Sequence, residues 1–160
     1  MNTARWSTID SAILVTAYRL RYRRMNSPEP LDDAVRRRMQ KQQRRDTSVE
    51  LSVRRLLHAG GFRYRVDYRP SSTLRCRGDI VFTRARVVVF IDGCFWHGCP
   101  QHATQPKNNA QWWREKLDAN MARDIRSAAA LEGRGWHVLR FWEHEEPGDI
   151  VDRIIATVEN

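Results

Sequence analysis

The chain has 160 residues, a length typical of one domain that buries enough apolar surface to fold without disulfide bonds. It carries 28 Lys or Arg against 19 Asp or Glu, a formal net charge of +9, which favours a polyanionic partner such as nucleic acid. No apolar run approaches the ~18 residues of a membrane span, and three cysteines are an odd number for a disulfide framework. We therefore expect a soluble intracellular protein whose cysteines bind a metal rather than one another.

Two features mark the N-terminal part of the chain. The segment Asn26–Pro30 breaks regular structure, so residues 1–30 are expected to form an N-terminal extension of unknown role and residues 31–160 the domain. A basic run without an acidic residue follows, either a solvated helix face or a surface that lies against DNA phosphates. Its members are Arg36, Arg37, Arg38, Lys41, Arg44 and Arg45.

The rest of the chain carries helix and strand signals in turn. Thr47 and Glu50 form a capping box that begins a helix, which Gly60 and Gly61 end. Residues 86–91 are a β-branched run typical of a strand buried on both faces. Further strands are expected at residues 62–67, 80–82 and 136–142, further helices at residues 110–132 and 147–158, and an irregular segment at residues 93–109. The order α-β-β-β-α-β-α predicts an α/β fold in which helices flank both faces of a mixed central β-sheet.

Three carboxylates are candidates for a magnesium site. Asp79 begins one predicted strand and Asp92 follows the next, so a tight turn between these strands would bring both to one edge of the sheet. Glu50 on the first helix could approach the same edge. Clustered carboxylates bind hard cations such as Mg²⁺, which would polarise a phosphoryl oxygen. The structural alternative is that Asp79 and Asp92 are turn residues and Glu50 is a helix cap.

A second group of residues has the spacing of a zinc site. Cys94, Cys99 and His102 lie within nine residues, and His144 follows a strand that could return beside them. Zn²⁺ binds four such ligands as a tetrahedron, and a closed set is structural. His97 is a fifth candidate, so one of the five residues must have another role. The alternative is that the cysteines are buried apolar residues.

Two aromatic pairs lie beside these ligands. Phe95 and Trp96 stand in the irregular segment, and Trp112 and Trp113 begin the long helix. A tryptophan most often packs in a core. In a basic protein, however, aromatic side chains on a loop can also insert between base pairs and unstack them.

Several spaced motifs resemble those of the very-short-patch-repair (Vsr) DNA mismatch endonucleases. The resemblance runs from about Arg36 to the C-terminus. The motifs are Asp46–Glu50, Arg77–Asp79, Val88–Pro100, Trp113–Lys116 with Asn120 and Arg123–Asp124, and Val138–His144. The resemblance implies a restriction-endonuclease-like α/β fold for residues 31–160. It also implies Mg²⁺-dependent nicking of one strand of double-stranded DNA, 5′ of the mispaired T in a T·G mismatch.

The resemblance further implies a role for individual residues. Asp79 would bind Mg²⁺ through its carboxylate and Ile91 through its backbone carbonyl, while Glu50 would hold metal-bound water. His97 would be the general acid/base. Asp92 is a further catalytic candidate. The structural zinc ligands would be Cys94, Cys99 and His144, with His102 as the fourth. The DNA contacts would be the wedge residues Phe95, Trp96 and Trp113, together with Lys116, Arg36, Arg37 and Arg38.

The sequence departs from the wider nuclease superfamily at two positions. Gly78 stands before Asp79 where Pro is usual, and no Lys follows Asp92, so His97 would take the place of that Lys. Two alternatives to a mismatch-nicking enzyme stay open: a non-catalytic, zinc-stapled DNA-binding module, and a nuclease without mismatch preference. We expect a monomer in the cytoplasm, associated with the nucleoid and acting with downstream repair proteins.

Overall fold

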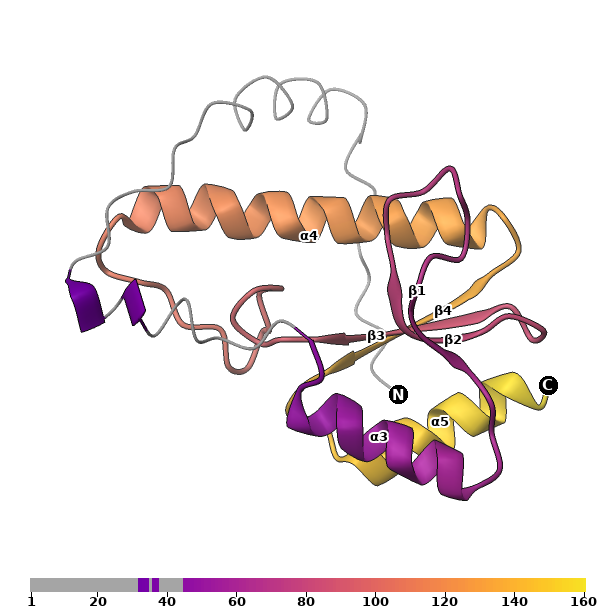
Figure 1. Ribbon diagram of the computed structural model, residues 1–160. Coiled ribbons are helices and arrows are strands. Elements are labelled where there is room, and N and C mark those ends of the chain that lie inside the picture. The colour runs from indigo at the N-terminus through magenta and orange to yellow at the C-terminus, as the bar shows by residue number, and fades with distance from the viewer. Residues whose placement is uncertain (1–31, 35, 38–44) are drawn as a thin grey trace.

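The computed structural model describes residues 32–34, 36–37 and 45–160, which form a mixed α/β structure (Figure 1). Residues 1–30 and Arg38, Lys41 and Arg44 of the basic run lie outside the described residues. In chain order the main elements are α3 (Ser48–Ala59), β1 (Arg65–Tyr68), β2 (Gly78–Phe82), β3 (Val87–Asp92), α4 (Ala110–Glu132), β4 (His137–Trp142) and α5 (Pro147–Val158). This order is the predicted one.

The four strands form one mixed sheet in the order β1-β2-β3-β4. β1 pairs with β2 and β2 with β3 in antiparallel fashion, whereas β3 and β4 are parallel and joined through α4. The helix α4 lies on one side of the sheet and α3 and α5 lie together on the other (Figure 1). The predicted mixed sheet with helices on both faces is therefore confirmed.

The alternation of side chains along β3 explains the two layers of core. Val87, Val89 and Ile91 pack with α3 and α5 in the larger cluster, while Val88 and Phe90 contribute to a smaller cluster on the α4 side. Successive residues of a strand point to opposite faces, so a strand between two helical layers must be apolar throughout. The prediction that this run is buried on both faces is confirmed.

The long helix α4 covers more than the sheet. Its 23 residues span about 34 Å, whereas a six-residue strand spans about 20 Å. Leu131, near its end, packs on the sheet, and its N-terminal half lies along the irregular segment (Figure 1). Its bounds and those of α5 are as predicted.

Every strand differs from its expected bounds by one to three residues at one end or both. The strand expected at residues 62–67 is Arg65–Tyr68, and Phe62 and Tyr64, which precede it, pack edge-on against the Phe82 ring. The strand expected at residues 80–82 begins two residues earlier, at Gly78, and β3 and β4 each begin one residue later than expected. Asp92 is the last residue of β3 rather than the residue after it, since it pairs in register with Trp142 of β4.

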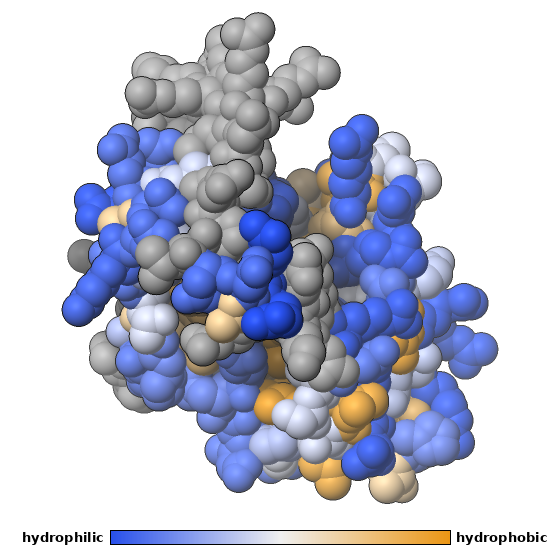
Figure 2. Space-filling model, turned by 60° about the vertical axis from the view of Figure 1, so that its left-hand side comes forward, coloured by the Kyte–Doolittle hydropathy of each residue, from blue (hydrophilic) through white to orange (hydrophobic). Residues whose placement is uncertain are grey.

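The described residues on the face shown in Figure 2 are largely polar. Hydrophilic side chains cover most of the face shown in Figure 2, and apolar side chains appear there only in small patches. Among the described residues, no helix is long and apolar enough to cross a membrane.

Candidate active site and metal centre

The candidate residues gather at one edge of the sheet because of the strand directions. β2 begins where its antiparallel neighbour β3 ends, and β4, parallel to β3, ends there too. Asp79 at the start of β2, Asp92 at the end of β3 and His144 after β4 therefore share this edge. The first turn of α3 brings Glu50 close enough for its charge to act on Asp79.

Asp79 is a partly buried carboxylate held by the backbone. Its Oδ2 atom accepts a hydrogen bond of 2.7 Å from the N–H of Ile91. Burial raises the pKa of Asp79 to about 6, and the charges of Glu50 and Asp92 act in the same direction, against the Ile91 N–H and Arg54. The three carboxylates therefore lie close enough for their charges to interact, and a cation bound there would relieve their repulsion.

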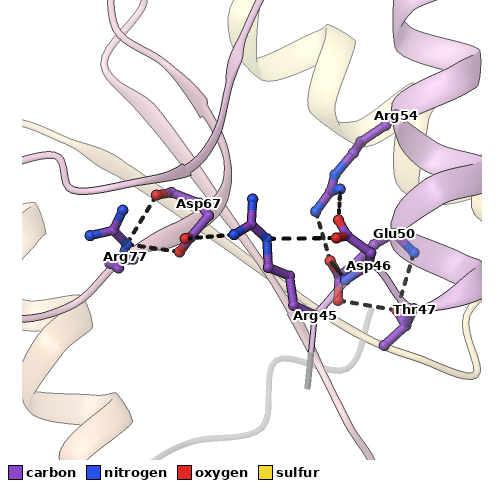
Figure 3. A network of polar contacts seen from close by, with 7 residues as sticks. All are labelled: Arg45, Asp46, Thr47, Glu50, Arg54, Asp67 and Arg77. Carbon is purple, nitrogen blue, oxygen red and sulfur yellow. Dashed lines mark hydrogen bonds and ion pairs between the residues drawn. The ribbon is translucent and has the colours of Figure 1, made fainter. Parts of the chain in front are cut away.

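Glu50 is both a helix cap and a buried charge (Figure 3). The Thr47 side chain accepts from the Glu50 N–H, and the Glu50 carboxylate accepts from the Thr47 hydroxyl and the Asp46 N–H. Arg54, one turn later, donates to Glu50 at 2.7 Å and also bonds Asp46. The predicted capping box is confirmed, and Arg54 compensates the charge that Glu50 buries.

The same network continues to the sheet (Figure 3). Arg45 lies 3.7 Å from Asp46 and 3.3 Å from Asp67 of β1, and Arg77 donates to Asp67 at 2.8 Å. The start of α3 is thereby tied to β1 and to the residue before β2. Of the rest of the basic run, Arg36 and Arg37 are exposed, and Arg36 lies 3.5 Å from Asp33.

His97 is held by residues from two other elements. Its Nδ1 atom lies 2.6 Å from Asp124 Oδ2 of α4 and 3.5 Å from Asp92 Oδ1. Arg140 of β4 donates two bonds of 2.6 Å to Asp92. Burial alone would raise the pKa of Asp124, but the hydrogen bond and charge of His97, with Arg140 and Arg123, lower it below its ordinary value.

The predicted cysteine–histidine cluster is assembled. The ligand atoms of Cys94, Cys99, His102 and His144 all lie within 4.8 Å of one another. Ligand atoms around zinc are separated by about 3–4 Å, and the Cys94 Sγ to His144 Nδ1 distance is 3.1 Å. Burial and the neighbouring Cys99 raise the pKa of Cys94 to about 12, so the thiol stays neutral unless a cation is present. These residues could hold zinc, and His97 stands outside them.

The aromatic side chains form one cluster over this edge. The ring centroids of Phe95 and Trp96 are 5.0 Å apart, and Trp113 lies 5.4 Å from Phe95 and 5.9 Å from Trp96. Trp113 is buried, whereas Phe95 and Trp96 are partly exposed. The Trp96 carbonyl accepts a bond of 3.1 Å from Asn120 of α4, which fixes the backbone beneath the two outer rings. Lys116 lies on the same helix.

Four residues of the site had no role in the sequence-based interpretation: Arg54, Asn120, Asp124 and Arg140. Asn120 and Asp124 carried a usable signal, because they continue the heptad-like spacing of Trp113 and Leu117 on α4. A polar residue on the apolar stripe of a helix indicates a buried polar partner. Arg54 and Arg140 carried no such signal, since their partners depend on how the elements meet.

Comparison with known proteins agrees with this geometry. The family described as DNA mismatch endonuclease Vsr matches residues 29–103. The type II nicking enzyme V.NaeI of Lentzea aerocolonigenes is 43% identical over 135 residues, 83% of this chain and 81% of that protein. The type II nicking enzyme V.XorIIP of Xanthomonas oryzae is 42% identical over 67% of this chain and 77% of that protein.

The DNA mismatch endonuclease Vsr of Escherichia coli is 36% identical over 62% of each chain. These relatives make the protein a DNA endonuclease, and its interpretation as a non-catalytic DNA-binding module is wrong. The chain belongs to the Vsr family of endonucleases.

Proposed function

We propose that the protein is a Mg²⁺-dependent endonuclease that nicks one strand of double-stranded DNA 5′ of the mispaired T in a T·G mismatch. The observation that supports the proposal is that Asp92 links the two candidate groups: its charge acts on Asp79, and its Oδ1 atom lies 3.5 Å from Nδ1 of His97, which directly follows Phe95 and Trp96 in the chain. In this proposal Asp79 binds the metal, His97 transfers a proton, and Phe95 and Trp96 insert into the base stack, all within one site.

The donor set at this edge suits Mg²⁺. Magnesium prefers oxygen ligands and usually keeps several waters. Asp79 would supply a carboxylate oxygen, Ile91 its backbone carbonyl, and Glu50 a hydrogen bond to a bound water. When bound there, the cation would polarise the scissile phosphate and lower the pKa of water. The same proposal gives Cys94, Cys99, His102 and His144 to a structural zinc ion.

His97 is the proposed general acid/base. When Nδ1 donates to Asp124, Nε2 carries the lone pair and can accept a proton from the attacking water. Asp124 also stabilises the imidazolium that proton transfer would create. Asp92, 3.5 Å from the same ring nitrogen, completes the polar surroundings of His97.

DNA binding is assigned to two kinds of contact. Phe95 and Trp96, supported by Trp113, would insert beside the mismatch, where the cost of unstacking is reduced. Lys116 and the basic residues Arg36, Arg37 and Arg38 would contact the DNA backbone, which positions the duplex without reading sequence. We further propose that residues 31–160 are the catalytic domain of a cytoplasmic, nucleoid-associated monomer acting with downstream repair proteins.

The decisive experiment compares two duplexes that differ in a single base pair, one fully matched and one with a T·G mismatch. We expect nicking 5′ of the mispaired T only when Mg²⁺ is added. Equal nicking of both duplexes would favour a nuclease without mismatch preference, a candidate consistent with relatives named as type II nicking enzymes. Nicking at full rate without a divalent cation would contradict the assigned metal site.

A further inference from the structure

Arg140 lies where two strands and a helix bring three carboxylates together. The even-numbered residues Val88 and Phe90 of β3 and Val138 of β4 face α4 and pack in the smaller core cluster. Asp92 and Arg140 continue that face, so the Arg140 side chain reaches both Asp92 on the neighbouring strand and Asp124 on α4. The third carboxylate, that of Asp79 on β2, interacts with the Arg140 guanidinium through its charge.

The guanidinium of Arg140 is fixed on three sides. Its Nε and Nη2 atoms each donate 2.6 Å bonds to Asp92, and Nη2 lies 3.5 Å from Asp124. The Phe90 ring supports the guanidinium at 5.0 Å. A bidentate, stacked arginine of this kind has a defined position, unlike a lysine, whose ammonium is a mobile point charge.

Two carboxylates face one nitrogen of His97. Asp124 lies 2.6 Å from Nδ1 and Asp92 lies 3.5 Å from it, whereas a ring N–H donates a full hydrogen bond to only one acceptor. Because Arg140 binds both oxygens of Asp92, it holds that carboxylate 3.5 Å from Nδ1, farther than Asp124 at 2.6 Å. His97 is then left with Asp124 as its acceptor, which selects one orientation of the ring.

We propose that Arg140 is a positioning residue for DNA nicking: by binding Asp92 and bracing Asp124, it reserves Nδ1 of His97 for Asp124 and fixes the imidazole ring. The inference rests on the proposed role of His97. An ion pair that only fastened β3 to β4 would change stability, and the nicking rate of the folded molecules would stay the same.

The test measures nicking by the full chain under single-turnover conditions, with Mg²⁺ and with enzyme in saturating excess over a T·G duplex. Arg140→Met keeps the apolar stem over Phe90 and removes the charge. We expect its rate constant to fall by about 10- to 100-fold, as for a displaced catalytic group, with the Kd for the duplex changed by less than about threefold. The double variant Asp92→Asn with Arg140→Met should recover about tenfold of this loss, because the competing charge is gone.

Arg153 provides the matched control. It also lies over an aromatic ring, that of Phe141 at 4.6 Å, and pairs with the carboxylate of Glu145 at 3.1 Å, away from His97. Arg153→Met should nick at the wild-type rate. If Arg140→Met does not fold, Arg140→Lys replaces it; this variant keeps a charge without the planar fork and should lose rate in the same direction.

Three results would overturn the inference: an unchanged rate in the Arg140 variants, a double variant no faster than Arg140→Met, or a loss confined to Kd. The last result would make Arg140 a DNA contact. A wild-type protein that nicks neither duplex would overturn the proposed function and the role of His97 with it. An active wild-type protein whose Arg140 variants match the Arg153 control would overturn only the inference.

Discussion

Asp79 shows how a catalytic candidate can weaken the fold that carries it. Its folded-state pKa of about 6 lies above the ordinary 3.8, so the folded protein holds this proton more tightly than the unfolded chain does. The associated stability is fully present below pH 3.8 and is lost as the pH rises through 6. A bound cation would restore it by stabilising the ionised carboxylate.

Asp79→Asn should therefore abolish nicking and yet stabilise the protein. Without added divalent cation at about pH 7.5, we expect its free energy of unfolding to exceed that of the wild type by about 1–3 kcal/mol. At about pH 4 the difference should largely disappear, because the wild-type carboxyl is then protonated in the folded protein. Urea unfolding at both pH values measures this.

Asp124→Asn is the matched control, because it should change the free energy of unfolding in the opposite direction. The folded-state pKa of Asp124 is lowered, so its ionised form stabilises the fold and the substitution should destabilise the protein at about pH 7.5. A destabilised Asp79→Asn variant at the same pH would contradict the inference that the ionised Asp79 carboxylate destabilises the folded protein.

Trp96 is the residue on which mismatch preference is expected to depend. Its partly exposed ring packs with Phe95 beside the Trp113 ring, on a backbone that Asn120 holds. Trp96→Ala should lower the ratio of T·G to matched nicking by about tenfold, the effect of losing ~1.4 kcal/mol of stacking. The two duplexes are assayed in parallel, so the ratio is its own control; an equal loss on both would make Trp96 a packing residue.

At the scale of the elements, two valine side chains, one from β2 and one from β3, fill the space over Gly78. A Cβ atom on Gly78 would lie 2.3 Å from Val88 Cγ2 and 2.8 Å from Val81 Cγ2. A side chain there would have to displace these two valines or move the backbone that carries the neighbouring Asp79. This contact explains why a glycine precedes Asp79.

Gly78→Ala should cost about 1–3 kcal/mol of stability, as overpacking does, and should reduce nicking as well. The comparison is Gly148→Ala in the first turn of α5, where a Cβ atom would meet nothing within 4 Å. That control should be unchanged or stabilised by at most about 1 kcal/mol. Equal thermal unfolding of the two variants would show that the strands have room to adjust.

The cysteine–histidine cluster joins the loop after β3, which supplies Cys94, Cys99 and His102, to His144, which follows β4. Zinc bound there should contribute several kcal/mol to folding, on the order of 5 or more. We expect one zinc per chain by metal analysis, and a lower Tm after chelation or in Cys99→Ser. Cys76→Ser changes a cysteine outside the cluster and should keep the metal. A chelated protein with an unchanged Tm would contradict this site.

For the whole molecule, the charge of +9 predicts binding that weakens as salt is added. Arg37→Ala combined with Arg38→Ala should weaken binding to matched and mismatched duplexes alike. The slope of log K against log salt should flatten by roughly one to two units, about one for each phosphate that the variant no longer neutralises. Binding titrations at several salt concentrations measure this, and an effect confined to the T·G duplex would assign these residues to recognition instead.

Most of the helices and strands could be predicted from local signals in the sequence. The bounds of α4 and α5, the doubly buried β3 and the capping box at Thr47 all follow from local patterns of burial and capping. The choice of His102 over His97 came from the resemblance to the Vsr family, and the structure places His102, rather than His97, beside Cys94, Cys99 and His144. The helices and strands depend on neighbouring residues, which is why periodicity and capping signals were sufficient to predict them.

Which charged groups meet could not be predicted from the sequence, because it depends on how distant strands and helices pack. Arg140 is 48 residues from Asp92, and Asp124 is 27 residues from His97. Their contacts arise because β4 is parallel to β3 and because α4 crosses back over the loop between them. No local pattern encodes a partner at that separation: the strand register and the placement of the helix fix it, and these are set by the packing of the whole core.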